Sequence, residues 1–337
     1  MESHRRRELD LTALELYQAL DALRFDVTRP ESLIEQLRQI DVGLPAEDEF
    51  AATIVWMGRC KFLQKLRQDQ NPRSSLATYR IPDLLAVFDC QGREVPVLVE
   101  VKSTHHPHLK WSPAYFQRQR RYAELMKMPL LVAWQWRRFG CWTLFDSEEL
   151  AGGRRIHFGE ALTQTLMTTL AGDFWVNFRQ GVGLHFVADV LDRSDTGEAA
   201  SVGEHGLLQP GPYRLRIADA YFTDGENRRH ERLEPPGLWP FLLTSSALEH
   251  QDKFQGLSVT ISHVIGPETD GMHMGQRVLP MLLEYQRDEL VSWRSILRRE
   301  AFPIPFSELR AAARGGIDTG FVHIVADIEP HRKPSFL

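Results

Sequence analysis

The chain has few cysteines, no long apolar run and no internal repeat. Its three cysteines, Cys60, Cys90 and Cys141, lie far apart and are an odd number, which excludes a disulfide framework and a zinc or iron–sulfur ligand set. No stretch approaches the roughly 20 apolar residues that cross a bilayer, and the basic N-terminus leads into an amphipathic segment rather than a secretion signal. A motif for a serine or cysteine nucleophile is missing as well. We therefore expect a cytoplasmic protein without membrane contact, whose cysteines are small buried hydrophobic residues.

The acidic balance of the whole chain hides one strongly basic segment. The formal net charge of −5 argues against a nucleic-acid ligand. Residues 102–138, however, contain eight lysines and arginines against the single acid Glu124, which gives this segment a formal charge of +7. Such a segment attracts a polyanion, although a solvated helix face is the alternative. Residues 160–337 carry −7, so this part is expected to contact a protein partner or a second copy of the chain rather than DNA.

The spacing of apolar residues and turn formers predicts a mixed α/β sheet built around one crossover. Helices are expected over 8–24, 28–40 and 44–68, strands over 76–80, 83–90 and 95–102, a helix over 112–128, and strands over 129–136 and 141–146. Farther along, we expect a helix over 160–171, strands near 184–191, 213–222, 257–265 and 321–328, a long helix over 275–299, and loops over 194–212 and 224–240. This order predicts a helical extension over 1–43, an α/β domain over 44–150 and a second α+β domain over 160–337.

Two carboxylates and one ammonium occur at the ends of two neighbouring predicted strands. Pro82-Asp83 opens one strand, and Glu100-Val101-Lys102 closes the next. Because side chains alternate along a strand, four valines of this strand share one face while Glu100 and Lys102 share the other. Charged groups at the end of a buried strand need partners or a bound metal to offset their desolvation. Asp83 and Glu100, with the carbonyl of Val101, can form part of an octahedral Mg²⁺ or Mn²⁺ shell.

Pro82-Asp83 together with Glu100-Val101-Lys102 resembles the motif of the PD-(D/E)xK nuclease superfamily, which has the restriction-endonuclease-like fold. The order of helix, three strands, helix and strand matches the core of that family, and the resemblance covers about residues 44–146. It implies a metal-dependent nuclease that hydrolyses phosphodiester bonds, of DNA on family grounds. Asp83 and Glu100 would bind the metal, and Lys102 would assist the attacking water. A role in prokaryotic defence or repair follows from the same resemblance alone.

Two further features of the family are only partly met. Many members carry another acid on the helix before the first strand, and Glu49 is the first candidate and Glu47 the second, although both also suit the first turn of any helix. Exonuclease-type members carry a glutamine and a tyrosine with three residues between them on the helix after the triplet. Gln119 and Gln117 do not have this spacing to Tyr122, so membership of that branch is not expected. One helical face, which is also what a buried core face looks like, collects Tyr115, Gln119, Tyr122 and Met126.

The basic helix supplies candidate phosphate contacts. Lys110, Arg118 and Arg121 are expected to hold backbone phosphates, which gives affinity without sequence specificity. Two other classes of function stay open. One is a catalytically inactive scaffold of the same fold that binds nucleic acid. The other is a structural or interaction protein in which Lys102 only pairs with one of the two carboxylates.

Overall fold

The computed structural model describes residues 46–202, 208–209, 211–245, 248–266, 272–285 and 304–337. The helices expected over 8–24 and 28–40, and with them the N-terminal extension over 1–43, lie outside these ranges. So does the part of the expected 275–299 helix beyond residue 285.

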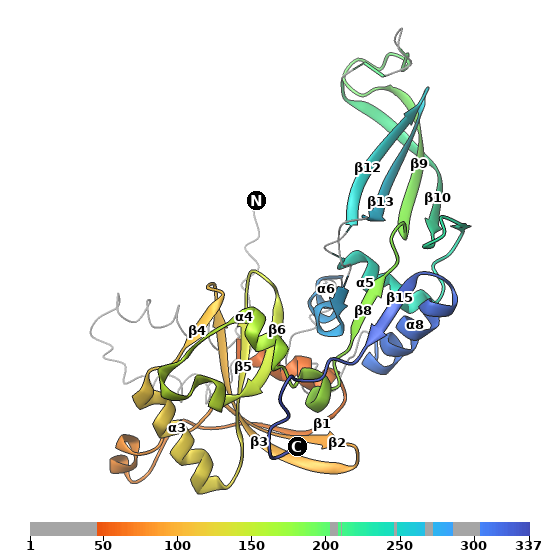
Figure 1. Cartoon of the computed structure of the whole chain (residues 1–337). Helices are drawn as coiled ribbons and strands as arrows, with labels where there is room; N and C mark the ends of the chain where they lie inside the picture. Colours follow the sequence, from red (N-terminus) through yellow and green to blue (C-terminus); the bar gives the residue numbers. More distant parts are fainter. Residues whose placement is uncertain (1–45, 203–207, 210, 246–247, 267–271, 286–303) are drawn as a thin grey trace, which may run out of the picture.

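A mixed five-stranded sheet organises the first half of the described chain, as the sequence predicts (Figure 1). Its strand order is β1 (Cys60–Lys65), β2 (Leu84–Cys90), β3 (Arg93–Thr104), β5 (Leu130–Trp136) and β6 (Cys141–Asp146). Neighbouring strands are antiparallel except β3 and β5, which are parallel because helix α3 (Pro113–Met126) carries the chain back between them. This architecture is compatible with a restriction-endonuclease-like core.

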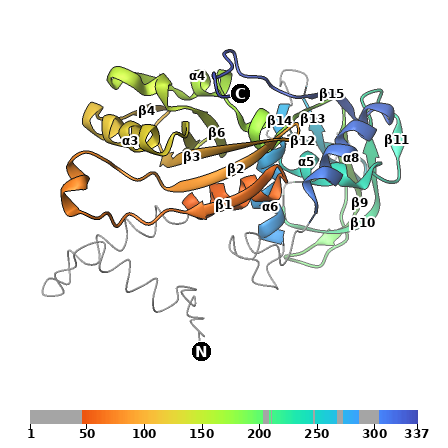
Figure 2. The ribbon, with the colours of Figure 1, turned by 90° about the horizontal axis from the view of Figure 1, so that it is seen from below.

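A helix covers each face of this sheet (Figure 2). The helix over residues 46–56 packs on the face that carries Val97 and Val99, both fully buried. Helix α3 packs on the opposite face against Leu98 and Trp134. The alternation predicted for the valine-rich strand is therefore confirmed, and it fixes which helix Glu100 must face.

The start of the sheet differs from the prediction. The helix expected over 44–68 ends at residue 56, and the chain turns at Gly58, whose φ of +88° is readily adopted only by glycine. Residues 60–65 then form the edge strand β1, which pairs with β2 and is exposed at most positions. The strand expected over 76–80 is instead a short 3₁₀ helix, Arg73–Ala77, followed by a loop. An edge strand that buries little has no alternating pattern, so its pairing with β2 decides its structure.

The second half contains two further sheets. The larger has the order β11 (Arg229–His230), β10 (Tyr213–Thr223), β9 (Gly183–Arg193), β13 (Ser258–Ile265) and β12 (Leu248–Gln255), and it projects from the rest of the described chain (Figure 1). The smaller has the order β14 (Met272–Met274), β8 (Trp175–Phe178) and β15 (Val322–Ala326). The four strands expected here are confirmed as β9, β10, β13 and β15.

Short helices join these strands, and some differ from the prediction. The described ones are α4 (Phe158–Thr163), α5 (Trp239–Leu243), α6 (Val278–Tyr285), α8 (Phe306–Asp318), a π-helical turn (Met167–Ala171) and 3₁₀ turns at Ser147–Gly153, Pro236–Leu238 and Gly275–Arg277. The helix expected over 160–171 is thus split into α4 and the π-helical turn, and the loop expected over 224–240 contains β11 and the start of α5. A two-strand pair, β4 (His108–Lys110) with β7 (Arg155–His157), lies beyond the end of β3. No described helix is long and apolar enough to cross a bilayer.

One continuous hydrophobic cluster joins the two halves. It runs from the helix over 46–56, through the valine face of the sheet, to α8 and β15. Trp56 packs edge-on against Phe306 with ring centroids 4.8 Å apart, and its indole N–H donates to the carbonyl of Ile304 at 2.8 Å. Residues 160–337 are therefore not seen as a separate second domain, because their core is shared with the sheet; the division near residue 150 stays a prediction.

Candidate functional site

The residue directly before β2, Asp83, lies next to β3. Strands β2 and β3 pair from Cys90 and Arg93 to Leu84 and Val99, and β3 then continues beyond its partner. Asp83, directly before β2, fills the place of the missing strand: its Oδ2 accepts a hydrogen bond from the backbone N–H of Val101 at 2.8 Å. The predicted neighbourhood of Asp83 and the Glu100-Val101-Lys102 triplet is therefore present in the structure.

The backbone of β3 directs the Val101 carbonyl to the same place. The N–H and C=O of one strand residue point to the same side of the strand. Leu98 donates its N–H to Pro129 on the β5 side at 2.9 Å, so residues of even number turn their backbone groups toward β5. Val101, of odd number, turns its carbonyl toward the side where β2 has ended and Asp83 lies.

Glu100 lies on the other face of β3, under α3, and is only 1% exposed. Three donors surround its carboxylate: the Lys102 ammonium, the Tyr115 hydroxyl at 2.5 Å and the Gln119 side-chain amide. The side chain of Lys102 is 31% exposed, so this group reaches from the buried carboxylate toward solvent. These hydrogen bonds offset the cost of burying the Glu100 charge.

Tyr115 and Gln119 were not identified from the sequence as partners of Glu100. They lie one helical turn apart on α3, on the face that the sequence grouped together and that could equally be core. Their order is tyrosine, three residues, glutamine, which is the reverse of the pattern sought around Tyr122. That reversed spacing is the signal in the sequence that could have identified them. Tyr122 is half-buried and packs against the hydrophobic cluster under α3, whereas Met126 is 42% exposed.

The two carboxylates repel each other. Desolvation, and next the charge of Glu100, raise the pKa of Asp83 to about 8. Burial disfavours the Lys102 ammonium, but Glu100, Tyr115 and Asp83 together outweigh this effect and hold the pKa of Lys102 above its ordinary value. Burial and Glu100 also raise the pKa of Tyr115 to about 12. A carboxylate that burial and a neighbouring carboxylate keep protonated near neutral pH is one that a bound cation would stabilise in its charged form.

The two acids proposed from the preceding helix occupy different surroundings. Glu49 Oε1 accepts from the Gln135 amide at 2.6 Å and the Trp142 indole at 3.1 Å, and burial raises its pKa. Glu47 has its pKa raised by burial first and also by repulsion from Glu100, and it in turn acts on Asp83. Glu47 pairs with Lys65 of β1 at 3.4 Å and interacts electrostatically with Glu100 and Asp83, whereas Glu49 is held by side chains of β5 and β6.

The expected phosphate contacts surround α3. Arg121 is exposed on this helix, and Arg118 is half-buried with one guanidinium N–H donating to the carbonyl of Leu76 at 3.3 Å. Lys110 is exposed on β4. Arg118 therefore also holds the 3₁₀ helix before β2, and Lys110 and Arg121 are exposed where a ligand in solvent can reach them.

The donor set fits a hard divalent cation. Asp83 Oδ1 has no hydrogen bond within the part of the chain that the structure describes, and it offers oxygen chemistry together with the Val101 carbonyl. Oε1 of Glu100 accepts two hydrogen bonds and Oε2 accepts one, so Oε2 keeps a lone pair that can bind a metal. The described residues contain no group of three His, Cys, Asp or Glu side chains placed for a metal. A shell completed by water and substrate oxygens, as is usual for Mg²⁺, is the kind that these residues suit.

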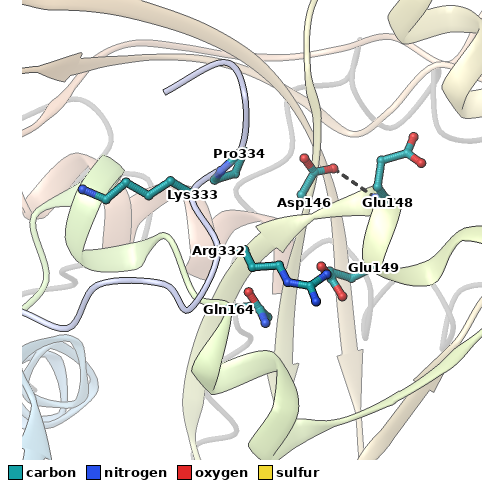
Figure 3. A pocket seen from close by; sticks show the side chains of 7 residues that line it. All are labelled: Asp146, Glu148, Glu149, Gln164, Arg332, Lys333 and Pro334. Atoms are coloured by element: carbon teal, nitrogen blue, oxygen red, sulfur yellow. Dashed lines mark hydrogen bonds between the residues drawn. The ribbon is translucent and has the colours of Figure 1, made fainter.

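A second feature is a pocket between the end of the five-stranded sheet and the C-terminal segment (Figure 3). It is lined by Asp146, Glu148, Glu149, Gln164, Arg332, Lys333 and Pro334. The backbone N–H of Glu148 donates to Asp146 Oδ1 at 3.0 Å. Arg332 of the C-terminal segment lies beside Glu149 and Gln164, whereas Lys333 points away and pairs with Glu329 at 2.6 Å (Figure 3). None of the lining residues belongs to the Asp83–Glu100 site.

No family model matches the chain, and no curated protein matches it by sequence. Among solved structures, the chain is similar to Hjc, a Holliday junction resolvase from the archaeal hyperthermophile Archaeoglobus fulgidus. The identity is 16%, the match covers 35% of this chain and 89% of that chain, and the TM-score is 0.28. A likeness of this size carries no argument about activity, so function has to be argued from the site itself.

Proposed function

We propose that the protein is a metal-dependent nuclease that hydrolyses phosphodiester bonds, with DNA as its substrate. The observation that carries the proposal is the pair Asp83 and Glu100, two mutually repelling carboxylates at the ends of adjacent strands, beside the cation of Lys102. The hydrogen bond from Val101 to Asp83 stabilises the sheet, but a second carboxylate beside Asp83 adds only repulsion to a purely structural sheet. A divalent cation removes that repulsion.

Each residue of the site has a role in this proposal. Mg²⁺ or Mn²⁺ held by Asp83, Glu100 and the Val101 carbonyl would polarise a phosphoryl oxygen and lower the pKa of a bound water. Lys102 keeps its positive charge at neutral pH, so it acts by orienting water or by neutralising charge on the phosphate rather than as a base. Tyr115 and Gln119 hold Glu100 in place. Glu47 joins the acid set in preference to Glu49.

The basic surface near α3 supports a nucleic-acid substrate. Lys110 and Arg121 are exposed cations, and Arg118 lies between them in sequence on the segment of charge +7. Contacts of this kind hold phosphates without selecting a sequence. A cytoplasmic setting, a role in defence or repair, and a protein partner or second copy at the acidic C-terminal part accompany the proposal and rest on the sequence alone.

A second candidate function is a catalytically inactive scaffold that binds nucleic acid or protein. The observation in its favour is that the buried Glu100 carboxylate already accepts hydrogen bonds from Lys102, Tyr115 and Gln119. In this case Lys102 is needed for folding and no divalent ion binds.

Nicking of supercoiled plasmid separates the two functions. Activity is measured with Mg²⁺, with Mn²⁺ and with EDTA, for the unchanged protein and for Asp83→Ala and Lys102→Ala. Glu94→Ala, which removes an exposed acid at the other end of β3, is the matched control. The nuclease predicts metal-dependent nicking that both site variants lose and the control keeps. Equal nicking by Asp83→Ala would contradict the assignment, and calorimetric titration with Mn²⁺ shows directly whether the ion binds.

A further inference from the structure

Arg80, which the sequence did not single out, is fixed beside the site. Its backbone N–H donates to the carbonyl of Arg118 on α3 at 3.1 Å. Its guanidinium carbon lies 5.3 Å from the ring centroid of Tyr115, the tyrosine whose hydroxyl bonds to Glu100. One aromatic ring therefore separates the Arg80 cation from the buried carboxylate.

Buried polar atoms without partners collect around this tyrosine. Six such side-chain atoms occur within the described ranges, and three of them are Arg80 Nε, Trp111 Nε1 and Gln119 Oε1. The Trp111 ring lies 5.8 Å from the Tyr115 ring, and Gln119 bonds to Glu100. Buried polar atoms are nearly always satisfied in native proteins, so a cluster of exceptions indicates a place where a water, an ion or a ligand completes the hydrogen bonds.

The Arg80 guanidinium brings a positive charge to the Tyr115 ring, and no acidic side chain in the described residues pairs with it. Lys102 also lies near the Tyr115 ring, at 5.6 Å from its centroid, but its ammonium is paired with Glu100. Arg80 forms no ion pair with an acid anywhere in the described part of the chain. A guanidinium presents a planar fork of donors that matches two oxygens of a phosphate group. Arg80 lies three residues before Asp83, and its guanidinium lies against the ring of the tyrosine that bonds to Glu100.

We propose that Arg80 binds a backbone phosphate of the nucleic-acid strand that enters the Asp83–Glu100 site, with its guanidinium held flat by the Tyr115 ring. The inference rests on the proposed function for the identity of the ligand. It adds a substrate-binding residue on the loop before β2, on the Tyr115 side of the carboxylates. It also gives that loop a function, since Arg118 and Arg80 together fasten it to α3.

The test is DNA affinity measured without cleavage. A short fluorescent duplex is titrated in EDTA over a series of salt concentrations, with Arg80→Gln and with Arg80→Met, which keeps an apolar stem over the tyrosine. Arg73→Gln, an exposed arginine of the 3₁₀ helix that precedes this loop, is the matched control. We expect either Arg80 variant to weaken binding by about tenfold or more, as for loss of a charged hydrogen bond, and to reduce the salt slope by about 1. Arg80→Lys should keep the slope and lose part of the affinity, because an ammonium lacks the planar fork.

Two results would overturn the inference: an unchanged salt slope and affinity in both Arg80→Gln and Arg80→Met, or no salt-dependent DNA binding by the unchanged protein. A lower melting temperature with unchanged binding would make Arg80 a structural cap of the loop. Plasmid nicking distinguishes a failure of the Arg80 inference from a failure of the nuclease assignment. If Asp83→Ala still nicks plasmid, the nuclease assignment fails even where Arg80 binds DNA. If Asp83→Ala is inactive and Arg80→Gln has the unchanged protein's KM and affinity, only the Arg80 inference fails.

Discussion

The side chain of Asp83 replaces a backbone partner of Val101. Its Oδ2 accepts the Val101 N–H at 2.8 Å, at the point where β3 extends past the end of β2. The same carboxylate is therefore part of the sheet's hydrogen bonding and part of the acid pair with Glu100. Its two roles can be separated, because an amide keeps the first and loses the second.

Asp83→Asn should keep the fold and lose the chemistry. An asparagine oxygen still accepts the Val101 N–H, whereas Asp83→Ala loses this bond at a cost of about 1 kcal/mol. The pKa of Asp83 is raised from 3.8 to about 8, so its effect on stability is favourable at low pH and is lost as pH rises through about 8. In EDTA, the unchanged protein should therefore lose unfolding free energy relative to Asp83→Asn as the pH rises from about 4 to about 8. Urea unfolding at several pH values checks this, and a pH-independent difference would contradict it.

Tyr115→Phe tests whether the tyrosine positions Glu100. Loss of the hydroxyl removes one of three donors to a buried carboxylate, at a cost of roughly 1.5–3 kcal/mol for a hydrogen bond to a charged group. We expect the Mn²⁺ concentration that gives the half-maximal nicking rate to be higher in this variant, since Glu100 is then held less firmly. Tyr122→Phe is the control, because this half-buried tyrosine lies on the same helix without a hydrogen bond to Glu100. A lowered melting temperature with an unchanged Mn²⁺ midpoint would reduce Tyr115 to a structural role.

The core strands could be predicted because their sequences carry their own boundaries. Strands β2 and β3 are apolar runs separated by Gln91-Gly92, both of which have positive φ in the turn. Ser112 caps α3, accepting from the N–H of Tyr115 at 3.2 Å, and Pro113 occupies its first turn. Local signals of this kind also predicted that Asp83 lies beside the Glu100-Val101-Lys102 triplet.

What could not be predicted depends on packing between distant segments. Edge strand β1 has no periodic pattern of its own, and its structure comes from pairing with β2. Glu47 and Glu49 are two residues apart on one helix, so which one approaches Glu100 depends on how that helix sits on the sheet. The donors that Tyr115 and Gln119 give to Glu100 likewise depend on the rotation of α3 over β3. The shared core of the two halves joins residues more than 200 positions apart, as Trp56 and Ile304 show.

Lys102→Met distinguishes a catalytic lysine from a structural one. Removing the ammonium leaves Glu100 with two neutral donors, and we expect destabilisation of about 2–3 kcal/mol, less than for a fully buried pair because the lysine side chain is 31% exposed. Lys102→Arg keeps the charge and should recover most of this stability. If Lys102 acts on the phosphate or the water, Lys102→Arg stays well below the unchanged protein in nicking rate although it is folded. Full activity in Lys102→Arg would mean that charge alone is needed.

Asp173 gives a prediction that does not depend on the nuclease assignment. This residue is 1% exposed and joins the two halves: its oxygens accept from the backbone and the side-chain amide of Gln276, and that amide also donates to the carbonyl of Trp142 at 2.9 Å. Burial raises the pKa of Asp173 from 3.8 to about 6. The folded protein thus binds this proton more tightly than the unfolded chain, and the stability due to it is present below about pH 4 and lost as pH rises through about 6. The loss is roughly 3 kcal/mol for a shift of about two pKa units.

Asp173→Asn should remove this loss. Its amide nitrogen faces the amide of Gln276, so the variant is less stable than the unchanged protein at pH 4, where Asp173 is protonated and can donate or accept. Between about pH 4 and pH 6 the unchanged protein loses stability that the variant does not, and the gap between their urea midpoints narrows. Asp318→Asn, an exposed acid on α8, is the control and should leave the gap constant. A gap that stays constant for Asp173→Asn as well would show that the carboxylate is not held protonated in the fold, and that the Gln276 contact is an ordinary charged hydrogen bond.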